Sequence, residues 1–240
     1  ELRAFLERLL PPLHLRPFLL PLPEAAFRQA GFGEAVEALL AQALAQGVPL
    51  RLLPALAAYL EATHPLPPEE TARRLLEAAL ALGAWEEALE AAGRYGGGLL
   101  LWTLERAGRP LLEGGKVEAF FRHAERVAHP SPRLRLLLAL GHRLRGERDR
   151  GLAVLEGFPE EDPALLAEAL LAQGTLLGLK GAHGEAEDVF SQGVALGETP
   201  LRARFLTSRG AARIRLGRYR EAAEDLEEAY RAMAPYSRVG

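Results

Sequence analysis

Hydrophobic residues after position 65 follow the helical period, the spacing that keeps them on one face of an α-helix. No segment there alternates hydrophobic and polar residues in the two-residue period of a half-buried strand. No Asn-Gly or Asp-Gly pair marks a β-hairpin either. The pattern therefore predicts an all-α fold for this part of the chain.

The proline distribution divides the sequence near residue 65. Ten of the 17 prolines lie in the first 68 residues, and the last of them are in the segment THPLPPEE, Thr63 to Glu70. Pro67 and Pro68 suit the first turn of a helix, where a backbone N–H needs no partner within the helix. We therefore expect two domains, residues 1–64 and residues 65–240.

Short helices are expected in the first domain. Their predicted ranges are Leu2 to Leu10, Leu22 to Gly31 and Gly33 to Gly47, followed by a brief extended piece that leads into a further helix within Val48 to Ala62.

A short segment with glycine in second place recurs along the second domain. The copies are LGAWEEAL, EGGKVEAF, RGERDRGL, KGAHGEAE and LGRYREAA, with the glycines Gly83, Gly115, Gly146, Gly181 and Gly217. Successive glycines lie 32, 31, 35 and 36 residues apart. These intervals are typical of helical repeats, in which pairs of amphipathic helices stack on one another.

Each glycine is predicted to end one helix in a left-handed conformation, so that the next helix begins a few residues later. We expect the residue two positions beyond the glycine to fill the turn, as with Trp85, His183 and Tyr219. Small residues then let the paired helices approach closely. They are Gly174 and Gly210 in first helices, and Ala88, Ala186, Ala222 and Ala229 in second helices.

From about Leu165 to Ala234 the chain resembles the tetratricopeptide repeat. That pattern has a glycine in the first helix, glycine and tyrosine at the turn, and alanine and phenylalanine in the second helix. The matching residues are Gly174, Phe190, Gly210, Gly217, Tyr219, Ala222 and Ala229, while Gly193 stands where alanine is usual. The resemblance implies a tetratricopeptide-like α-solenoid whose concave groove is lined by first helices.

The order of segments over most of the chain also resembles transcription regulators of the maltose-activator type, a LuxR-like group of signal-transduction ATPases. Leu53-Pro54-Ala55-Leu56 occupies the place of a family motif, and the segment from Leu80 to Ala92 looks like the first family repeat. This resemblance implies that residues 1–64 form a small winged-helix-like helical arm. It also implies that the chain is a part of a longer regulator.

Counting back along each first helix from its turn glycine gives the residues expected to face the groove and bind a ligand or partner. They are Arg133, Leu136, Leu140 and Arg143, then Glu168, Leu171 and Thr175, then Arg204, Thr207 and Ala211. Trp102 is a candidate core residue or a candidate aromatic anchor.

Arginines crowd two of the repeats, and two explanations are open for them. The clusters are Arg133, Arg135, Arg143, Arg145, Arg148 and Arg150, and Arg202, Arg204, Arg209, Arg213, Arg215, Arg218 and Arg220. They could form ion pairs between repeats with acidic second helices such as the one containing Glu221 and Asp225. They could also bind an anionic ligand or acidic peptide in the groove.

Composition narrows the function classes. The chain has 240 residues and no cysteine, and the lack of cysteine excludes thiol chemistry and disulfides. Its net charge of -3 argues against a basic nucleic-acid binder. Residues 1–62 contain six glutamates and five arginines, so we expect no direct DNA contact there. No hydrophobic run is long enough for a membrane span and no signal peptide is recognisable, so we expect a cytoplasmic protein. The lack of asparagine is typical of a thermophile, although a GC-rich genome gives much the same bias.

No enzyme motif was found. The sequence lacks a phosphate loop, a nucleophile elbow and an HExxH segment, so we expect no catalytic residue, metal or cofactor. The leading hypothesis is a non-enzymatic sensor module of a transcription regulator that binds a protein, a peptide or a small-molecule inducer in the solenoid groove. The alternative is a stand-alone tetratricopeptide adaptor that binds a peptide or helix of a partner protein.

Overall fold

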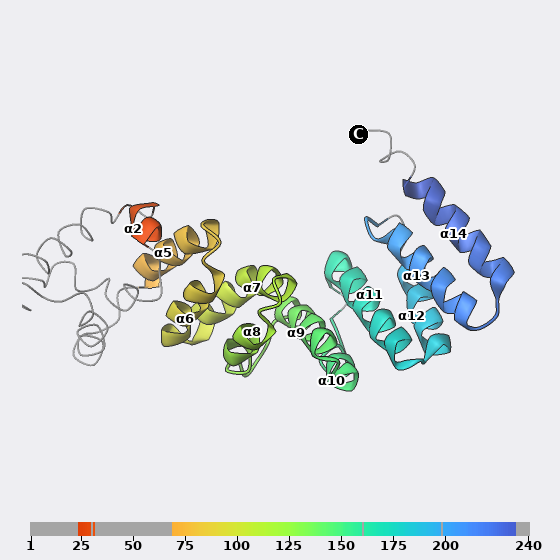
Figure 1. Ribbon diagram of the computed structural model, residues 1–240, viewed down its shortest axis with the longest axis horizontal. Coiled ribbons are helices and arrows are strands. Elements are labelled where there is room, and N and C mark those ends of the chain that lie inside the picture. The colour runs from red at the N-terminus through yellow and green to blue at the C-terminus, as the bar shows by residue number, and fades with distance from the viewer. Residues whose placement is uncertain (1–23, 30, 32–68, 160, 198, 234–240) are drawn as a thin grey trace, which may run out of the picture. The chain divides into compact units, whose positions relative to one another are not determined.

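The computed structural model describes residues 24–29, 31, 69–159, 161–197 and 199–233, and α-helices form the framework of these ranges (Figure 1). Since no strand occurs in them, the predicted all-α class is confirmed for this part of the chain. Helix α2 (Glu24–Gln29) lies inside one predicted helix. The other helices predicted before residue 65, and the predicted domain boundary, fall outside the described residues. Among the described helices, none has the length and apolar character of a membrane span.

The chain divides into two compact units, Glu1–His129 and Pro130–Gly240. In the first unit α2 packs on α5, and the following helices pack on their neighbours in the sequence. Their bounds are α5 (Glu69–Ala81), α6 (Trp85–Tyr95), α7 (Gly97–Glu113) and α8 (Val117–Ala124).

In the residues of the second unit that the structure describes, the helices form three pairs. Their bounds are α9 (Pro132–Arg145), α10 (Arg148–Ala153), α11 (Pro163–Lys180), α12 (His183–Ala195), α13 (Arg202–Arg215) and α14 (Tyr219–Met233). Besides the contacts between neighbours in sequence, α11 packs against both α9 and α13. We call α5, α7, α9, α11 and α13 first helices, and α6, α8, α10, α12 and α14 second helices.

One turn geometry joins the two helices of every pair. After α9, the N–H of Gly146 donates to the carbonyl of Arg143 (3.1 Å), and the N–H of Glu147 donates to that of His142 (2.9 Å). The same two bonds recur at the other four turns. The turn glycines and their φ angles are Gly83 (74°), Gly115 (76°), Gly146 (77°), Gly181 (86°) and Gly217 (77°). Each second helix begins two residues after its glycine. The prediction that these glycines end one helix in a left-handed conformation, shortly before the next helix begins, is therefore confirmed.

Replacing Gly217 by alanine should lower the free energy of unfolding by about 1 kcal/mol, because an alanine at positive φ is strained even where space is open. Gly184→Ala is the matched control. Gly184 lies within α12 without a positive φ, and a Cβ there would meet no atom within 4 Å. Urea denaturation of both variants checks this expectation, and equal stability of the two variants would contradict it.

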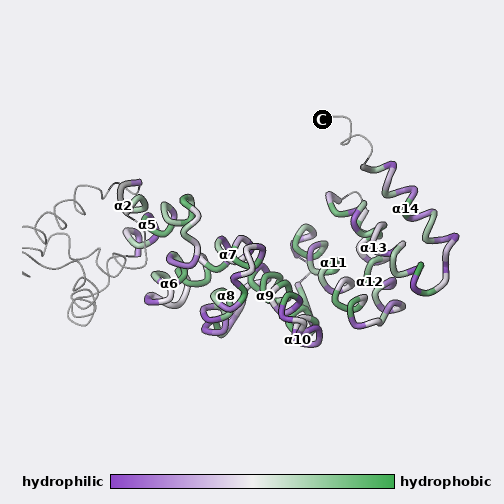
Figure 2. Tube along the Cα trace, in the orientation of Figure 1, coloured by the Kyte–Doolittle hydropathy of each residue, from purple (hydrophilic) through white to green (hydrophobic). Residues whose placement is uncertain are grey.

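Small residues let the paired helices approach one another, as predicted. Ala88, Ala186, Ala222 and Ala229 are all buried. A Cβ on Gly174 of α11 would collide with the ring of Phe190 on α12, so this glycine allows the ring to lie against the helix backbone. Figure 2 shows hydrophobic and hydrophilic positions interleaved along the helices, as expected where one face of each is buried.

The predicted filling of the turns holds in part. Trp85 is half-buried, and its ring lies 3.7 Å from where a Cβ on Gly83 would stand. His183 is also half-buried. The prediction is wrong for Tyr219, whose side chain is 69% exposed at the start of α14. The glycine therefore determines that the second helix begins two residues later. Whether the side chain at that position is buried depends on which other helices lie near it.

His123 of α8 is a buried titratable residue in the first unit. Its Nε2 lies 3.4 Å from a carboxylate oxygen of Glu90 on α6, and its buried Nδ1 has no hydrogen-bond partner. Burial lowers the pKa of His123 below its ordinary value, and the nearby Arg126 and Arg122 act in the same direction, whereas Glu90 opposes them. The neutral imidazole is therefore the form that suits the folded state.

Acidification should destabilise the protein through His123. As the pH falls below about 6.5, the unfolded chain takes up a proton that the folded chain resists, so the free energy of unfolding decreases. We expect His123→Gln to show a smaller loss of stability between pH 7.5 and pH 5 than the parent chain. Urea denaturation at several pH values tests this, and identical pH dependence of the two proteins would rule out the role of His123.

Candidate functional site

Three consecutive first helices of the second unit, α9, α11 and α13, lie side by side, because α11 packs on both of the others (Figure 1). Their C-terminal ends all lead into the same type of glycine turn. Residues that precede their turn glycine by the same number of positions therefore occupy equivalent places on the three helices. The predicted groove residues belong to this set, for example Arg133, Glu168 and Arg204.

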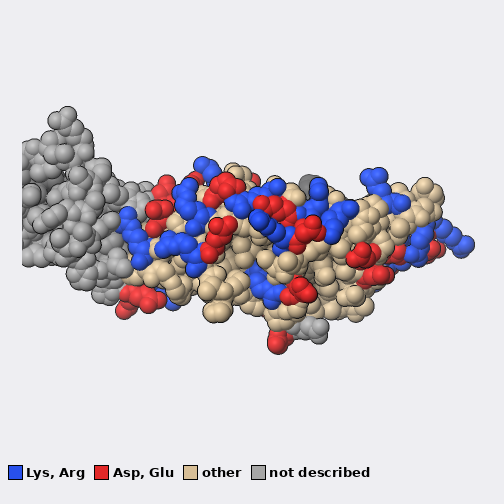
Figure 3. Space-filling view, turned by 90° about the horizontal axis from the view of Figure 1, so that it is seen from below, with Lys and Arg blue, Asp and Glu red and all other residues tan. Residues whose placement is uncertain are grey.

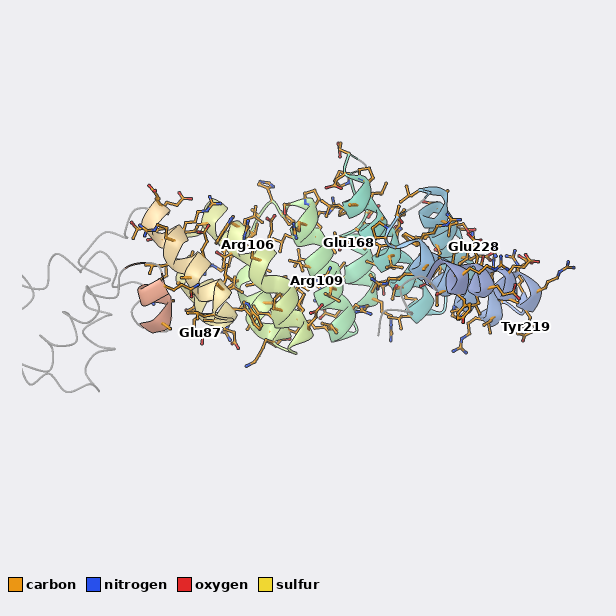
Figure 4. The ribbon with its side chains drawn as sticks, turned by 90° about the horizontal axis from the view of Figure 1, so that it is seen from above. Glu87, Arg106, Arg109, Glu168, Tyr219 and Glu228 are labelled. Atoms are coloured by element: carbon orange, nitrogen blue, oxygen red, sulfur yellow. The ribbon has the colours of Figure 1, made fainter. Side chains whose placement is uncertain are left out.

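We call the exposed and half-buried residues of this side the first-helix face. Among the predicted residues, Arg133, Arg143, Arg204, Thr207 and Ala211 are exposed, and Leu140, Glu168 and Thr175 are half-buried. Figure 4 labels Glu168 on α11. Eight of the ten predicted residues are therefore exposed or half-buried.

The other two predicted residues, Leu136 and Leu171, are core residues. Leu136 is 9% exposed and packs in a cluster with Ala139 and Leu176, while Leu171 is 7% exposed and packs in a cluster with Phe190 and Phe205. Both lie on the same side of their helices as the other predicted groove residues, but neighbouring side chains cover them. They hold the first helices together and present no side chain for binding.

The two threonines of the face use their hydroxyl hydrogens within their own helices. Thr175 donates to the carbonyl of Leu171 (2.6 Å), and Thr207 donates to that of Ala203 (2.8 Å). Their oxygens keep acceptor capacity for a ligand, and their methyl groups add apolar surface.

Exposed hydrophobic residues at the ends of the first helices were missed from the sequence. Leu144 of α9, Leu179 of α11 and Ile214 of α13 are 48%, 51% and 44% exposed. Each precedes its turn glycine by two or three residues, and this position is the signal that could have identified them. They extend the first-helix face and give it apolar contact points at the C-terminal ends of the three helices.

Arginines of the last repeat form a network of ion pairs across α12, α13 and α14. Arg209 donates to both oxygens of Asp225 (2.9 and 2.6 Å), and Arg213 bridges Asp225 (2.8 Å) and Glu187 (2.9 Å). Arg218 completes the network with Glu187. Because Arg209 donates hydrogen bonds to the Asp225 carboxylate, its pKa is raised further above its ordinary value. Ion pairing between repeats is therefore confirmed for Arg213 and Arg218, which bind Glu187 of the preceding pair, whereas Arg209 pairs with Asp225 within its own repeat.

Arginines of the earlier repeat are also partly engaged in structural contacts. Arg135 donates to the carbonyls of Val154 (2.7 Å) and Glu156 (2.6 Å), and Arg150 lies 3.3 Å from Glu147. Other arginines stay available. Within the ranges that the structure describes, Arg133, Arg143 and Arg204 form no ion pair. The first-helix face therefore keeps three exposed cations.

Trp102 of α7 lies in the first unit and is half-buried. The guanidinium carbons of Arg73 and Arg106 lie 5.0 and 4.2 Å from its ring centroid. Figure 4 labels Arg106. The indole is thus covered by cation–π contacts within the protein, which supports the core role over that of an aromatic anchor.

Charges on the described surface are mixed in sign. In the view of Figure 3, basic and acidic side chains alternate and do not separate into large patches of one sign. No group of three or more His, Asp or Glu residues in the described ranges is arranged to hold a metal ion.

Comparison with known proteins adds no relative, since neither a family model nor a curated protein matches this chain.

Proposed function

We propose that the chain is a non-enzymatic binding module of helical repeats that holds a peptide or helix of another protein on its first-helix face. One observation carries the proposal. Leu144, Leu179 and Ile214 are exposed at the C-terminal ends of three adjacent first helices, and the exposed cations Arg143 and Arg204 belong to the same first-helix face. Apolar groups repeated at helix spacing, on a face that also carries exposed cations, suit an extended partner.

The composition of the face indicates the chemistry of the partner. Leucine and isoleucine side chains would contact apolar anchor residues, and the three arginines would donate to carboxylates. Glu168 is the one acid among the predicted face residues. An acidic peptide with two or three large apolar residues is therefore the partner that the face fits best.

Binding of a peptide or helix on the first-helix face would serve either a sensor module of a regulator or a stand-alone adaptor. A sensor module of a maltose-activator-type regulator would pass the binding event to other parts of a longer protein. A stand-alone adaptor would use the same face to hold its partner. The proposed solenoid groove is the surface that α9, α11 and α13 share in either setting.

A peptide library displayed on phage and selected against the 240-residue chain tests the proposal. We expect the selected peptides to be acidic and apolar. The double variant Arg143→Glu, Arg204→Glu should bind them at least tenfold more weakly, since charge reversal replaces attraction by repulsion.

The matched control is the double variant Arg148→Glu, Arg220→Glu, which makes the same charge change on second helices. Both of its arginines are exposed on α10 and α14. Fluorescence anisotropy gives the two dissociation constants. Equal weakening by both double variants would show that only net charge matters, and the proposed face would then be wrong.

A further inference from the structure

Helix α14 exposes a stripe of apolar residues along one side. Tyr219, Ala223, Leu226 and Tyr230 are spaced at four, three and four residues, which places them on one face of the helix. Tyr219, Leu226 and Tyr230 are 69%, 38% and 73% exposed, and Ala223 is exposed as well. Figure 4 labels Tyr219 at the start of this helix. We call these four residues the α14 stripe.

The equivalent side of α12 is covered. Gly181 and Gly217 are 36 residues apart, so the α14 stripe corresponds to His183, Glu187, Phe190 and Val194. Phe190 is 4% exposed, Glu187 is 7% exposed, and the other two are half-buried. Each position is therefore more exposed on α14 than on α12.

The cover on α12 includes the first helix of the next pair, α13. Arg213 of α13 donates to Glu187 (2.9 Å), and Arg202 donates to the carbonyl of Val194 (3.0 Å). Arg209 reaches the hydroxyl of Ser191 at 3.4 Å. A first helix with a basic flank is thus what packs on this side of a second helix.

The preceding pair shows the same arrangement. Leu155, which follows α10, is 4% exposed and packs in one cluster with Ala169 and Leu176 of the next first helix, α11. In the part of the chain that the structure describes, α13 is the helix packed on α14, and it contacts the other side of Leu226 through Gly210. The α14 stripe is therefore equivalent to surfaces that the next first helix covers in the two preceding pairs.

Charge beside the α14 stripe favours a basic partner. Glu227 stands at the position equivalent to Ser191, the group that accepts from Arg209. Glu224 and Glu227 have side-chain exposures of 67% and 69%, and they form exposed pairs with Arg220 and Arg231 of the same helix. The helix still has five acidic and two basic residues, so the excess negative charge disfavours pairing of two α14 helices.

We propose that the α14 stripe docks an amphipathic helix of a partner protein, apolar along one face and with arginine or lysine on one flank, packed as α13 packs on α12. The occupant differs from the acidic peptide proposed for the first-helix face. The two surfaces would therefore bind partners of opposite charge.

A synthetic peptide with the sequence from Leu201 to Leu216 is the probe, because it carries the apolar face and arginines of α13. Fluorescence anisotropy with the 240-residue chain should show saturable binding. The double variant Tyr219→Ser, Tyr230→Ser should weaken it at least tenfold, since exposed aromatic residues dominate such interfaces. Both tyrosines are exposed, so circular dichroism should show unchanged folding.

Leu179→Ser is the control, because it removes an exposed hydrophobic residue from the first-helix face and should leave peptide binding unchanged. A peptide with Arg209→Glu and Arg213→Glu should bind more weakly than the parent peptide. Absence of binding, or equal binding by the tyrosine double variant, would overturn the proposal. Dimerisation of the chain in sedimentation equilibrium that the tyrosine substitutions abolish would assign the α14 stripe to a second copy and would also overturn it.

Discussion

Replacing Gly193 by alanine is expected to lower the free energy of unfolding by about 3 kcal/mol, the upper part of the range for overpacking a core. A Cβ on this residue of α12 would stand closer than 3.0 Å to three carbons of the Phe205 ring. Phe205 of α13 is fully buried, so the ring cannot move away without displacing its neighbours. Urea denaturation followed by circular dichroism measures the loss.

Gly178→Ala is the matched control. Gly178 lies within α11, and a Cβ there would meet no atom within 4 Å, so the substitution should stabilise the helix by up to about 1 kcal/mol. A double-mutant cycle with Phe205→Ala adds a second check. Removal of the ring should make Gly193→Ala at least 1 kcal/mol less costly. Equal cost in both backgrounds would show that the ring contact is not the cause.

Replacing Asp225 by alanine should also cost about 3 kcal/mol, the cost of leaving buried cations without their carboxylate. Asp225 has a side-chain exposure of 4% and binds Arg209 and Arg213, each 15% exposed. Glu187 still pairs with Arg213, but Arg209 would lose both of its short carboxylate contacts. Thermal and urea denaturation measure the effect.

Glu224→Ala is the control for this charge change. Glu224 and Arg220 form an exposed pair at 3.7 Å on the same helix, and such pairs contribute at most about 0.5 kcal/mol. We expect Asp225→Ala to be far more destabilising than Glu224→Ala. If the two substitutions cost the same, the network across α12, α13 and α14 does not stabilise the unit.

The glycine turns could be predicted from the sequence because their conformation is local. A positive φ restricts the residue to glycine in practice, and the same short pattern recurs at each turn, as at Gly146 and Gly181. Close contacts between paired helices could also be predicted, because Gly174 and Ala222 must be small whatever surrounds the helix pair. The all-α class and the helix pairs followed from these signals.

Burial of individual side chains could not be predicted in the same way. Counting along a helix gives the direction of Leu136 and Leu171, but their burial depends on how closely the next first helix packs. Tyr219 shows the reverse case, since it begins a second helix at the expected place and remains exposed. The exposed Leu144 and Leu179 were missed because isolated leucines near a turn look like core residues.

The arginine clusters show a third limit of sequence reasoning. Pairing with acidic second helices was one of two explanations, and a composition count cannot separate paired from unpaired residues. The structure separates them by position. Arg209 and Arg213 face α14 and are paired, whereas Arg204 lies on the first-helix face. Only the second kind can bind a partner without a loss of stability.

Site-specific photocrosslinking tests most directly whether binding takes place on the first-helix face. Benzoylphenylalanine would be placed at Leu179, which is 51% exposed on α11, or at Gln192, which is exposed on the second helix α12. With an acidic peptide selected against the whole chain, irradiation should crosslink the peptide at residue 179 and give only background at residue 192. Equal or stronger crosslinking at residue 192 would contradict the assignment of binding to the first helices.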